Sequence, residues 1–237
     1  ARVAFALGGV LVAGQGGHFV GGGVGVGYAE PLHGRGAAIG DALTRILKYL
    51  NYPVTTEYYI NDTGNQINVL GRSVKYRAVE LVHENHTDEE TKWFIESGYK
   101  GEYLTAIAQT IMTDLKWTAA EQIRPADNAL VADKTQKLIL AQIRGELAQF
   151  NVEFDRWYRE SALYSQGLVD TTLTELRTKN LIYEKDNAEW FASTRFGDDK
   201  DRVIKRTGGN YTYLAADIAY HKVKFARGYQ QLINIWG

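Results

Sequence analysis

The part of the chain that most constrains its fold is a strand-like run followed by a turn and a helical pattern. Residues 54–60 read VTTEYYI, and such a run of β-branched and aromatic residues predicts a buried strand. The polar residues NDTG follow, and an apolar period of 3.6 residues then predicts a helix from about residue 65. A helix before the strand ends at Pro53. Its apolar face consists of Ile39, Leu43, Ile46 and Leu50. This alternation predicts an α/β fold with a parallel sheet.

Composition narrows the chemistry that is open to the chain. The 237 residues are 45% hydrophobic and 23% charged, which suits one large globular domain or a domain with an insertion. The net charge of −1 gives no overall attraction for nucleic acid, so an RNA contact would need a local patch or a further part of the protein. The absence of cysteine excludes disulfides, thiolate metal sites and a cysteine nucleophile, and it fits a reducing compartment. No apolar run is long enough to span a bilayer, so we expect no membrane contact.

Four segments are expected from the changes in composition along the chain. Residues 1–29 are glycine-rich and lack the G-x-G-x-x-G pattern of a dinucleotide loop. We interpret them as a flexible stretch or as a segment whose side-chain identities differ from those printed. Residues 30–83 are predicted to carry the first half of a sheet domain, 84–137 a polar helical insertion, and 138–237 the second half.

The second half of the chain alternates between helical and strand patterns. Apolar periodicity and turn residues predict helices over about 130–149, 168–179 and 212–227, strands over 152–158, 202–207 and 231–237, and a hairpin over 181–193.

The segment PLHGRG at 31–36 is the first candidate site. Glycines at the start of a helix let backbone N–H groups approach a phosphate, and the helix dipole favours the negative charge. His33 could donate a hydrogen bond to a phosphate oxygen as charge develops, and Arg35 could add positive charge. The alternative is a surface loop with a capping role.

Two further candidate sites carry polar residues in suggestive positions. Asn61, Asp62, Asn65 and Gln66 cluster where a parallel strand ends, which is where open α/β sheets bind ligands, although turn and capping chemistry also explains them. Tyr213, Asp217 and His221 are spaced four residues apart on one helical face. A tyrosine hydroxyl with a carboxylate can hold a guanidinium or ammonium group; the alternative is an amphipathic helix with Asp217 in solvent.

Two acidic or histidine-rich segments are better explained without a ligand. His83 and His86 have loose metal-ligand spacing but lie in a charged segment, and the aspartates of FGDDKDR at 196–202 suit a turn. We therefore expect no protein metal site.

Four segments together resemble one family. PLHGRGAAIGDAL, EYYINDTGNQ, STRFGDDKDRV and TYLAADIAYHKVKF…LINIWG occur in the order and rough spacing of bacterial arginyl-tRNA synthetases, and the resemblance covers about residues 31–82 and 138–237. It implies the catalytic domain of a class I aminoacyl-tRNA synthetase, with a Rossmann-like parallel sheet interrupted by a helical insertion.

The resemblance also implies an activity and a set of site residues. Enzymes of that family use ATP and Mg²⁺ to activate L-arginine as arginyl-adenylate and transfer it to the 3′ end of tRNA(Arg). His33 would then be catalytic and would bind ATP with Gly34 and Gly36, while Tyr213 and Asp217 would bind arginine. The expected rim of the active site consists of Asn61, Asp62, Gln66 and His221. We expect a cytoplasmic monomer.

This chain departs from the family pattern in three places. The segment PLHGRG is shorter than the family's Pro-Leu-His-Val-Gly-His-Gly-Arg-Gly and holds one histidine instead of two. The preceding GGVGVGYAE has neither the glutamate nor the asparagine of the family's arginine pocket at the matching position, and Glu30 is too close to Pro31 to take the glutamate's place. The chain ends before a Lys-Met-Ser-Lys-Ser-like loop and an anticodon-binding domain, so we expect that it does not complete aminoacylation alone.

Two alternatives stay open at the level of sequence. Another class I synthetase, for glutamate or glutamine, is disfavoured because Asp217 would repel an acidic substrate and gives glutamine no charge complement. A non-catalytic RNA- or protein-binding module that keeps the synthetase fold is favoured by the shortened PLHGRG segment.

Overall fold

The structure is a computed structural model of the chain, and it describes residues 3–9 and 31–235. Within these ranges the strands form a four-stranded parallel sheet of order β3-β2-β1-β7 and a three-stranded antiparallel sheet of order β4-β5-β6. The strands of the parallel sheet are β1 (Val3–Gly9), β2 (Val54–Ile60), β3 (Arg156–Arg159) and β7 (Gln231–Ile235). The predicted α/β class with a parallel sheet is confirmed.

The other elements follow the predicted pattern closely. The helices are α1 (Pro31–Tyr49), α2 (Asn65–Leu81), α3 (Asp88–Ser97), α4 (Tyr103–Leu115), α5 (Ala120–Ile123), α6 (Asn128–Gln149), α7 (Ser161–Ser165), α8 (Leu168–Thr178) and α9 (Tyr213–Ala226). The antiparallel strands are β4 (Ile182–Lys185), β5 (Ala188–Phe191) and β6 (Arg202–Lys205). Asp186 and Asn187 connect β4 to β5 with φ of 54° and 56°, as a tight type I′ hairpin requires. None of the helices in the described ranges is long and apolar enough to cross a membrane.

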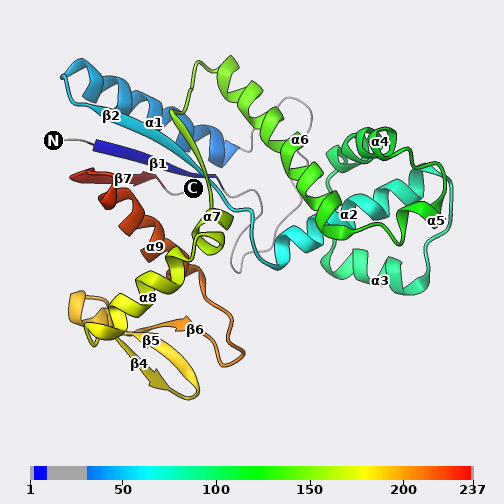
Figure 1. Ribbon diagram of the computed structural model, residues 1–237. Helices are drawn as coiled ribbons and strands as arrows, with labels where there is room; N and C mark the ends of the chain where they lie inside the picture. The colour runs from blue at the N-terminus through cyan, green and yellow to red at the C-terminus, as the bar shows by residue number, and fades with distance from the viewer. Residues whose placement is uncertain (1–2, 10–30, 236–237) are drawn as a thin grey trace.

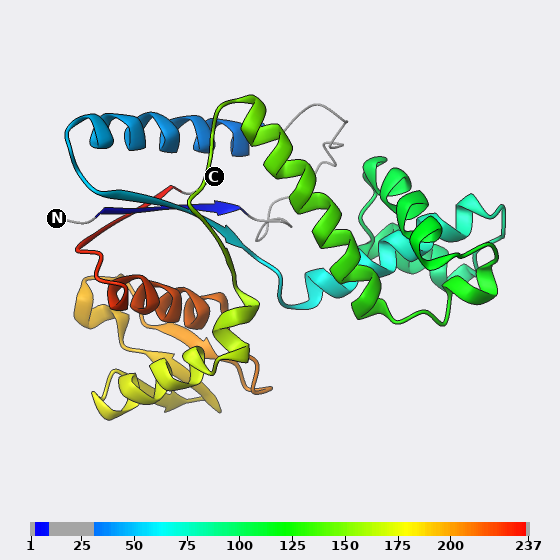
Figure 2. The ribbon, with the colours of Figure 1, turned by 45° about the horizontal axis from the view of Figure 1, so that its top comes forward.

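Helices cover both faces of the parallel sheet (Figure 1, Figure 2). Successive side chains of β2 alternate between the two faces, as the strand period of two demands. Tyr58 and Ile60 pack with α1 and α6 on one face, in a cluster that includes Leu140. Tyr59 packs on the other face against α9, α7 and α8. The antiparallel sheet contributes Ile204 to this second cluster.

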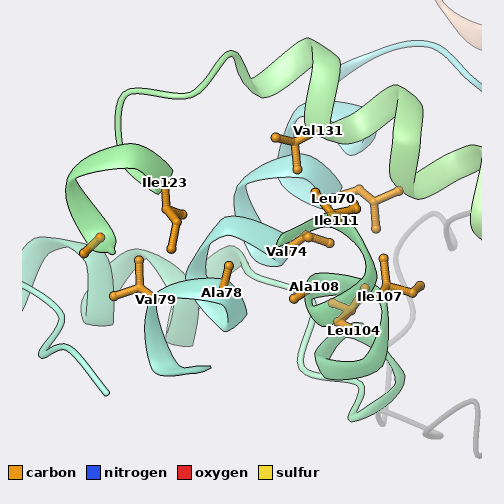
Figure 3. Close-up of a cluster of buried hydrophobic side chains, with 11 residues drawn as sticks. Leu70, Val74, Ala78, Val79, Leu104, Ile107, Ala108, Ile111, Ile123 and Val131 are labelled. Carbon is orange, nitrogen blue, oxygen red and sulfur yellow. The ribbon is translucent and has the colours of Figure 1, made fainter. Parts of the chain in front are cut away.

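A helical unit, α2 to α6, projects from one side of the sheet (Figure 1). Its apolar core combines side chains from α2, α4, α5 and α6 (Figure 3). The members are Leu70, Val74, Ala78, Val79, Leu104, Ile107, Ala108, Ile111, Ala120, Ile123 and Val131. This core begins in α2, upstream of the predicted insertion at 84–137, and the boundary at residue 84 stays a prediction.

The first strand, β1, is missing from the sequence prediction. It lies between β2 and β7, parallel to both, with Val3 in register with Val54 and Gln231. A flexible stretch is therefore wrong for residues 3–9. The remainder of the glycine-rich segment, and with it GGVGVGYAE, lies outside the described residues.

The strand predicted at 152–158 is shorter and begins later, at Arg156. A side chain replaces the backbone ladder just before it: the Asp155 carboxylate accepts hydrogen bonds from the Thr56 backbone N–H at 2.7 Å and from its hydroxyl at 2.9 Å. Residues before Arg156 are thus held to β2 by Asp155 instead of by strand pairing.

Helix α1 is confirmed, but its apolar stripe does not face the sheet. Ile39, Leu43, Ile46 and Leu50 are 38–55% exposed. Ala37 and Thr44 are each 4% exposed and lie on the inward side instead. At Gly40 an added Cβ would come within 3.1 Å of the Ile235 side chain, so the helix approaches β7 closely through a small residue.

Candidate functional site

The candidate site lies where β2 and β3 end. Ile60 and Arg159 are paired at the last position of the two parallel strands, so the residues that follow each strand meet at one edge of the sheet. Asn61 and Asp62 follow β2, and Glu160 follows β3. Ligands of open α/β sheets bind at this edge.

Asp62 ties the ends of the two strands together. Its side chain is 2% exposed and accepts hydrogen bonds from Arg159 Nη1 at 3.0 Å, from the Ser161 N–H at 2.8 Å and from the Ser161 hydroxyl at 2.7 Å. With its neighbours it also lines a cavity of about 320 Å³ that reaches the start of α2 and the side of α6. The geometry therefore gives Asp62 a holding role, and its predicted role at an active-site rim stays a prediction.

Glu160 is a buried carboxylate without a cationic partner among the described ion pairs. It is 3% exposed and accepts a hydrogen bond from the Thr63 hydroxyl at 2.8 Å. Burial raises its pKa, the hydrogen bond from Thr63 and the nearby Tyr59 hydroxyl act to lower it, and the negative charges of Asp217 and Asp62 act to raise it. Glu160 is thus a carboxylate that a bound cation would favour in its charged form.

Asp217 brings a second carboxylate to the same place. It lies half-buried in α9, burial raises its pKa, and no described residue forms an ion pair with it. Tyr213 begins α9 one helical turn earlier and is 47% exposed. The structure thus keeps the predicted pair on one helix, with Asp217 half-buried and Tyr213 exposed.

Tyrosines complete the surroundings of the two carboxylates. Burial raises the pKa of Tyr164 to about 12, with further contributions from Glu160 and Asp217. Burial also raises the pKa of Tyr59, and the same two carboxylates add to the shift. We call Tyr59, Glu160, Tyr164, Tyr213 and Asp217 the carboxylate–tyrosine cluster. Its negative charges and hydroxyl groups suit a planar cation that donates several hydrogen bonds.

His221 lies one turn beyond Asp217 and faces the sheet. Its Nδ1 is 2.7 Å from the Asp217 carbonyl oxygen, and its Nε2 is 2.9 Å from Asn234 Nδ2 on β7. His221 therefore contacts the backbone that carries Asp217, and its predicted place at the rim stays a prediction.

The PLHGRG segment forms the first turns of α1. The helix begins at Pro31, at the edge toward which the parallel strands point (Figure 2). Gly36 is buried, and the side chain of His33 lies outside the part of the chain whose side chains the structure describes. A helix N-terminus at this edge suits an anion, as predicted, while the roles of His33, Gly34 and Gly36 stay predictions.

Three members of the cluster escaped the sequence analysis: Tyr59, Glu160 and Tyr164. Glu160 was within reach, because it lies two residues after the strand predicted at 152–158, and parallel strands end at the edge where Asn61 and Asp62 are expected. Of the remaining predicted rim residues, Asn61 is half-buried after β2 and Gln66 lies in the first turn of α2.

An open parallel sheet with helices on both faces and a polar carboxyl edge defines a Rossmann-like α/β domain. The family described as tRNA synthetases class I (R), catalytic domain, matches residues 29–233, and the chain belongs to that family. The resemblance noted in the sequence is thereby confirmed.

Individual relatives agree with the family. The chain is 44% identical to the arginine–tRNA ligases of Solidesulfovibrio magneticus and of Bacillus subtilis, matching 86% of its own length and 36% of theirs. A crystal structure from Campylobacter jejuni, described as an arginyl-tRNA synthetase, superposes with a TM-score of 0.80 at 34% identity and covers all of this chain and 48% of that one. The chain therefore spans little more than a third of the curated relatives it matches.

Proposed function

We propose that this chain is the catalytic part of an arginyl-tRNA synthetase. It would activate L-arginine with ATP as arginyl-adenylate and transfer the arginine to the 3′ end of tRNA(Arg), in the cytoplasm and as a monomer. The observation that carries the proposal is the Asp217 carboxylate, which is half-buried and lacks an ion-pair partner in the described chain. A buried charge of this kind is expensive unless a partner arrives.

The arginine side chain fits the carboxylate–tyrosine cluster. A guanidinium offers five N–H donors in a planar fork, and Asp217 can accept two of them in parallel. Glu160, just after β3, adds a second negative charge, and the hydroxyl groups of Tyr59 and Tyr213 can accept or donate further bonds. The cluster would repel an acidic substrate, which argues against a synthetase for glutamate.

ATP would bind at the N-terminus of α1. The backbone N–H groups of the first turn and the helix dipole suit its phosphates, and glycine at residues 34 and 36 leaves room for close approach. His33 would donate a hydrogen bond to a phosphate oxygen as charge develops during adenylate formation. Mg²⁺ would neutralise the phosphate charge and would enter with ATP, because this ion keeps several waters and binds proteins through few carboxylates.

The short PLHGRG segment favours a second candidate function, a non-catalytic RNA- or protein-binding module that retains the synthetase fold. The two candidates differ in one reaction, since only an active synthetase exchanges pyrophosphate into ATP. ATP–pyrophosphate exchange with the full-length protein, arginine and tRNA(Arg) therefore separates them: exchange supports the first candidate, and its absence in a folded protein supports the second.

The arginine site is tested by calorimetric titration of the chain with L-arginine. Asp217→Asn keeps the shape of the side chain and removes the charge, so we expect binding to weaken about 100-fold, equal to about 2.7 kcal/mol. Asp186→Asn makes the same chemical change in the exposed β4–β5 turn and should leave the affinity unchanged. L-citrulline, which has the shape of arginine without the charge, should bind poorly. Equal arginine affinity of wild type and Asp217→Asn would contradict the proposal.

Arginine binding should also release protons. The pKa values of Asp217 and Glu160 are raised in the free protein, and a bound guanidinium would lower both. The affinity should therefore fall as the pH drops through the range in which these carboxylates become protonated. Calorimetry in buffers of different ionisation enthalpy measures the proton release, which Asp217→Asn should reduce.

A further inference from the structure

A chain of hydrogen bonds connects Asp217 to β7, the outer strand of the parallel sheet that pairs with β1. The Asp217 carbonyl oxygen lies 2.7 Å from His221 Nδ1, and His221 Nε2 lies 2.9 Å from Asn234 Nδ2. The side-chain amide oxygen of Asn234, Oδ1, accepts a hydrogen bond from Lys224 Nζ at 2.9 Å. Three of these residues lie on α9 and Asn234 lies on β7, so the chain of bonds crosses from the helix to the sheet.

The chemistry of its members fixes the direction of every bond in this chain. The ammonium group of Lys224 has donors only, so the oxygen of the Asn234 amide must face it. The Asn234 NH₂ group must then face His221, whose Nε2 can only accept. The remaining nitrogen, Nδ1, therefore carries the proton and donates it to the carbonyl oxygen of Asp217. One lysine thus specifies the amide orientation, the tautomer and the neutral charge of the imidazole.

We propose that His221 is a positioning residue of the arginine site, held as a neutral Nδ1–H imidazole by Asn234 and Lys224 so that it adds no positive charge beside Asp217. The predicted effect of His221 on arginine binding rests on the proposed function of this site. An imidazolium in this position would neutralise Asp217 and compete with the guanidinium of the substrate. A neutral imidazole instead fixes the turn of α9 that carries Asp217 and leaves the carboxylate free for a cation.

The charges around His221 agree with a neutral ring. Burial lowers its pKa, and the positive charge of Lys224 acts in the same direction, whereas Asp217 acts to raise it. From β7 the ring meets the uncharged amide of Asn234. The nearest acidic group of β2, Glu57, is occupied by Arg227 and the Tyr220 hydroxyl.

Nitrogen-15 NMR of the imidazole rings tests the proposed state directly and needs no arginine. The chain has five histidines, and the signal that disappears in His221→Gln is that of His221. We expect a neutral ring with the proton on Nδ1 at about pH 6, where an unperturbed histidine is mostly protonated. In Asn234→Asp a carboxylate faces Nε2, so the ring should become protonated at the same pH. An Nε2–H tautomer or an imidazolium in the wild type would overturn the proposal.

The consequence for arginine binding is tested by measuring the arginine affinity of two variants of His221. His221→Gln keeps the group neutral and should bind arginine within about threefold of wild type, whereas His221→Lys adds a fixed charge and should bind about tenfold more weakly. Ala226→Lys places the same charge at the exposed end of α9 and should have no effect. Equal affinities of folded His221→Gln and His221→Lys would overturn the positioning role. Failure of the wild type to bind arginine would overturn the proposed function, while the NMR result would still decide the state of His221.

Discussion

Two buried contacts in this molecule are made from different kinds of side chain. Between α2 and α4 in the helical unit, Leu70, Val74, Leu104 and Ile111 are at most 1% exposed and belong to one apolar core (Figure 3). Between α9 and the sheet, Glu57 is 2% exposed and Lys224 is 1% exposed. Glu57 accepts hydrogen bonds from Tyr220 and Arg227, and Lys224 donates to Asn234.

The two contacts contribute differently to the fold: the apolar contact mainly adds stability, and the charged contact mainly defines how its elements are oriented. Apolar burial contributes free energy without regard to direction, so the helical unit needs only suitable shapes and volumes. A buried charge gains little net free energy, but its bonds have fixed donors and acceptors. The contact between α9 and the sheet therefore defines the orientation of the helix that carries Asp217. Substitutions in the two contacts should consequently fail in different ways.

The largest loss of stability is expected from breaking the Glu57–Arg227 ion pair. Among the described residues, Arg227→Met leaves buried Glu57 with only the Tyr220 hydroxyl as a side-chain hydrogen-bond donor, which should lower the free energy of unfolding by about 3–5 kcal/mol. Replacing both partners, as in Glu57→Leu with Arg227→Met, should recover most of that loss. Urea unfolding measures both variants, and Arg206→Met at an exposed position is the control. If Arg227→Met alone were as stable as the double variant, the buried charge of Glu57 would not be the cause of the loss, and the proposed difference between the two contacts would be wrong.

The apolar contact should respond to lost volume instead. Leu104 is fully buried in the core of the helical unit, so Leu104→Ala should lower the free energy of unfolding by about 2–5 kcal/mol through lost burial and a cavity. Gln109→Ala on the exposed side of the same helix is the control. Arginine affinity of the folded fraction should be unchanged in Leu104→Ala, because the cluster that binds it lies on other elements. A change in affinity would show that the two contacts are coupled.

The charged contact should also show a pH dependence that the apolar one lacks. Burial lowers the pKa of Lys224 to about 8, below its ordinary value of 10.5. Above pH 8 the folded protein loses this proton while the unfolded chain keeps it, so stability should rise from pH 8 to about 9.5, by about 1–2 kcal/mol. Lys224→Met should remove the rise, and Lys222→Met, on the exposed ion pair with Glu175, should retain it. Chemical unfolding at several pH values measures it, and a rise that persists in Lys224→Met would assign it to another group.

Local patterns in the sequence predict much of this fold. The run VTTEYYI matches β2 residue for residue, and the Asp186-Asn187 turn lies where the hairpin pattern placed it. These elements are predictable because strand propensity and turn conformation depend on neighbouring residues. The spacing of Tyr213 and Asp217 is a local property too, so the helix that carries the proposed arginine site could be recognised early.

Contacts between elements that lie far apart in the sequence could not be predicted from it. The apolar stripe of α1 correctly predicted a helix but not its inward face, which is set by how closely Ala37 and Gly40 let the helix approach the sheet. β1 escaped detection because a short apolar run with alanine and glycine does not alternate, as is typical of a central parallel strand. Glu57 and Arg227 are separated by 170 positions, and only the tertiary fold brings them together.

The smallest effect is expected at the start of α3, at the far end of the helical unit. Thr87 and Glu90 form a capping box there: the Glu90 N–H donates to the Thr87 hydroxyl at 3.1 Å and the Thr87 N–H donates to the Glu90 carboxylate at 2.9 Å. Thr87→Ala removes one of these bonds and should lower the free energy of unfolding by about 1 kcal/mol, whereas Thr87→Ser should retain nearly all of it. Amide hydrogen exchange should quicken in α3 and stay unchanged in α9, because α3 packs on α2, where the buried Phe94 ring stacks on Tyr76, and not on α9. Faster exchange in α9 as well would mean that the helical unit and the charged contact unfold together, and the two contacts would then belong to one cooperative unit.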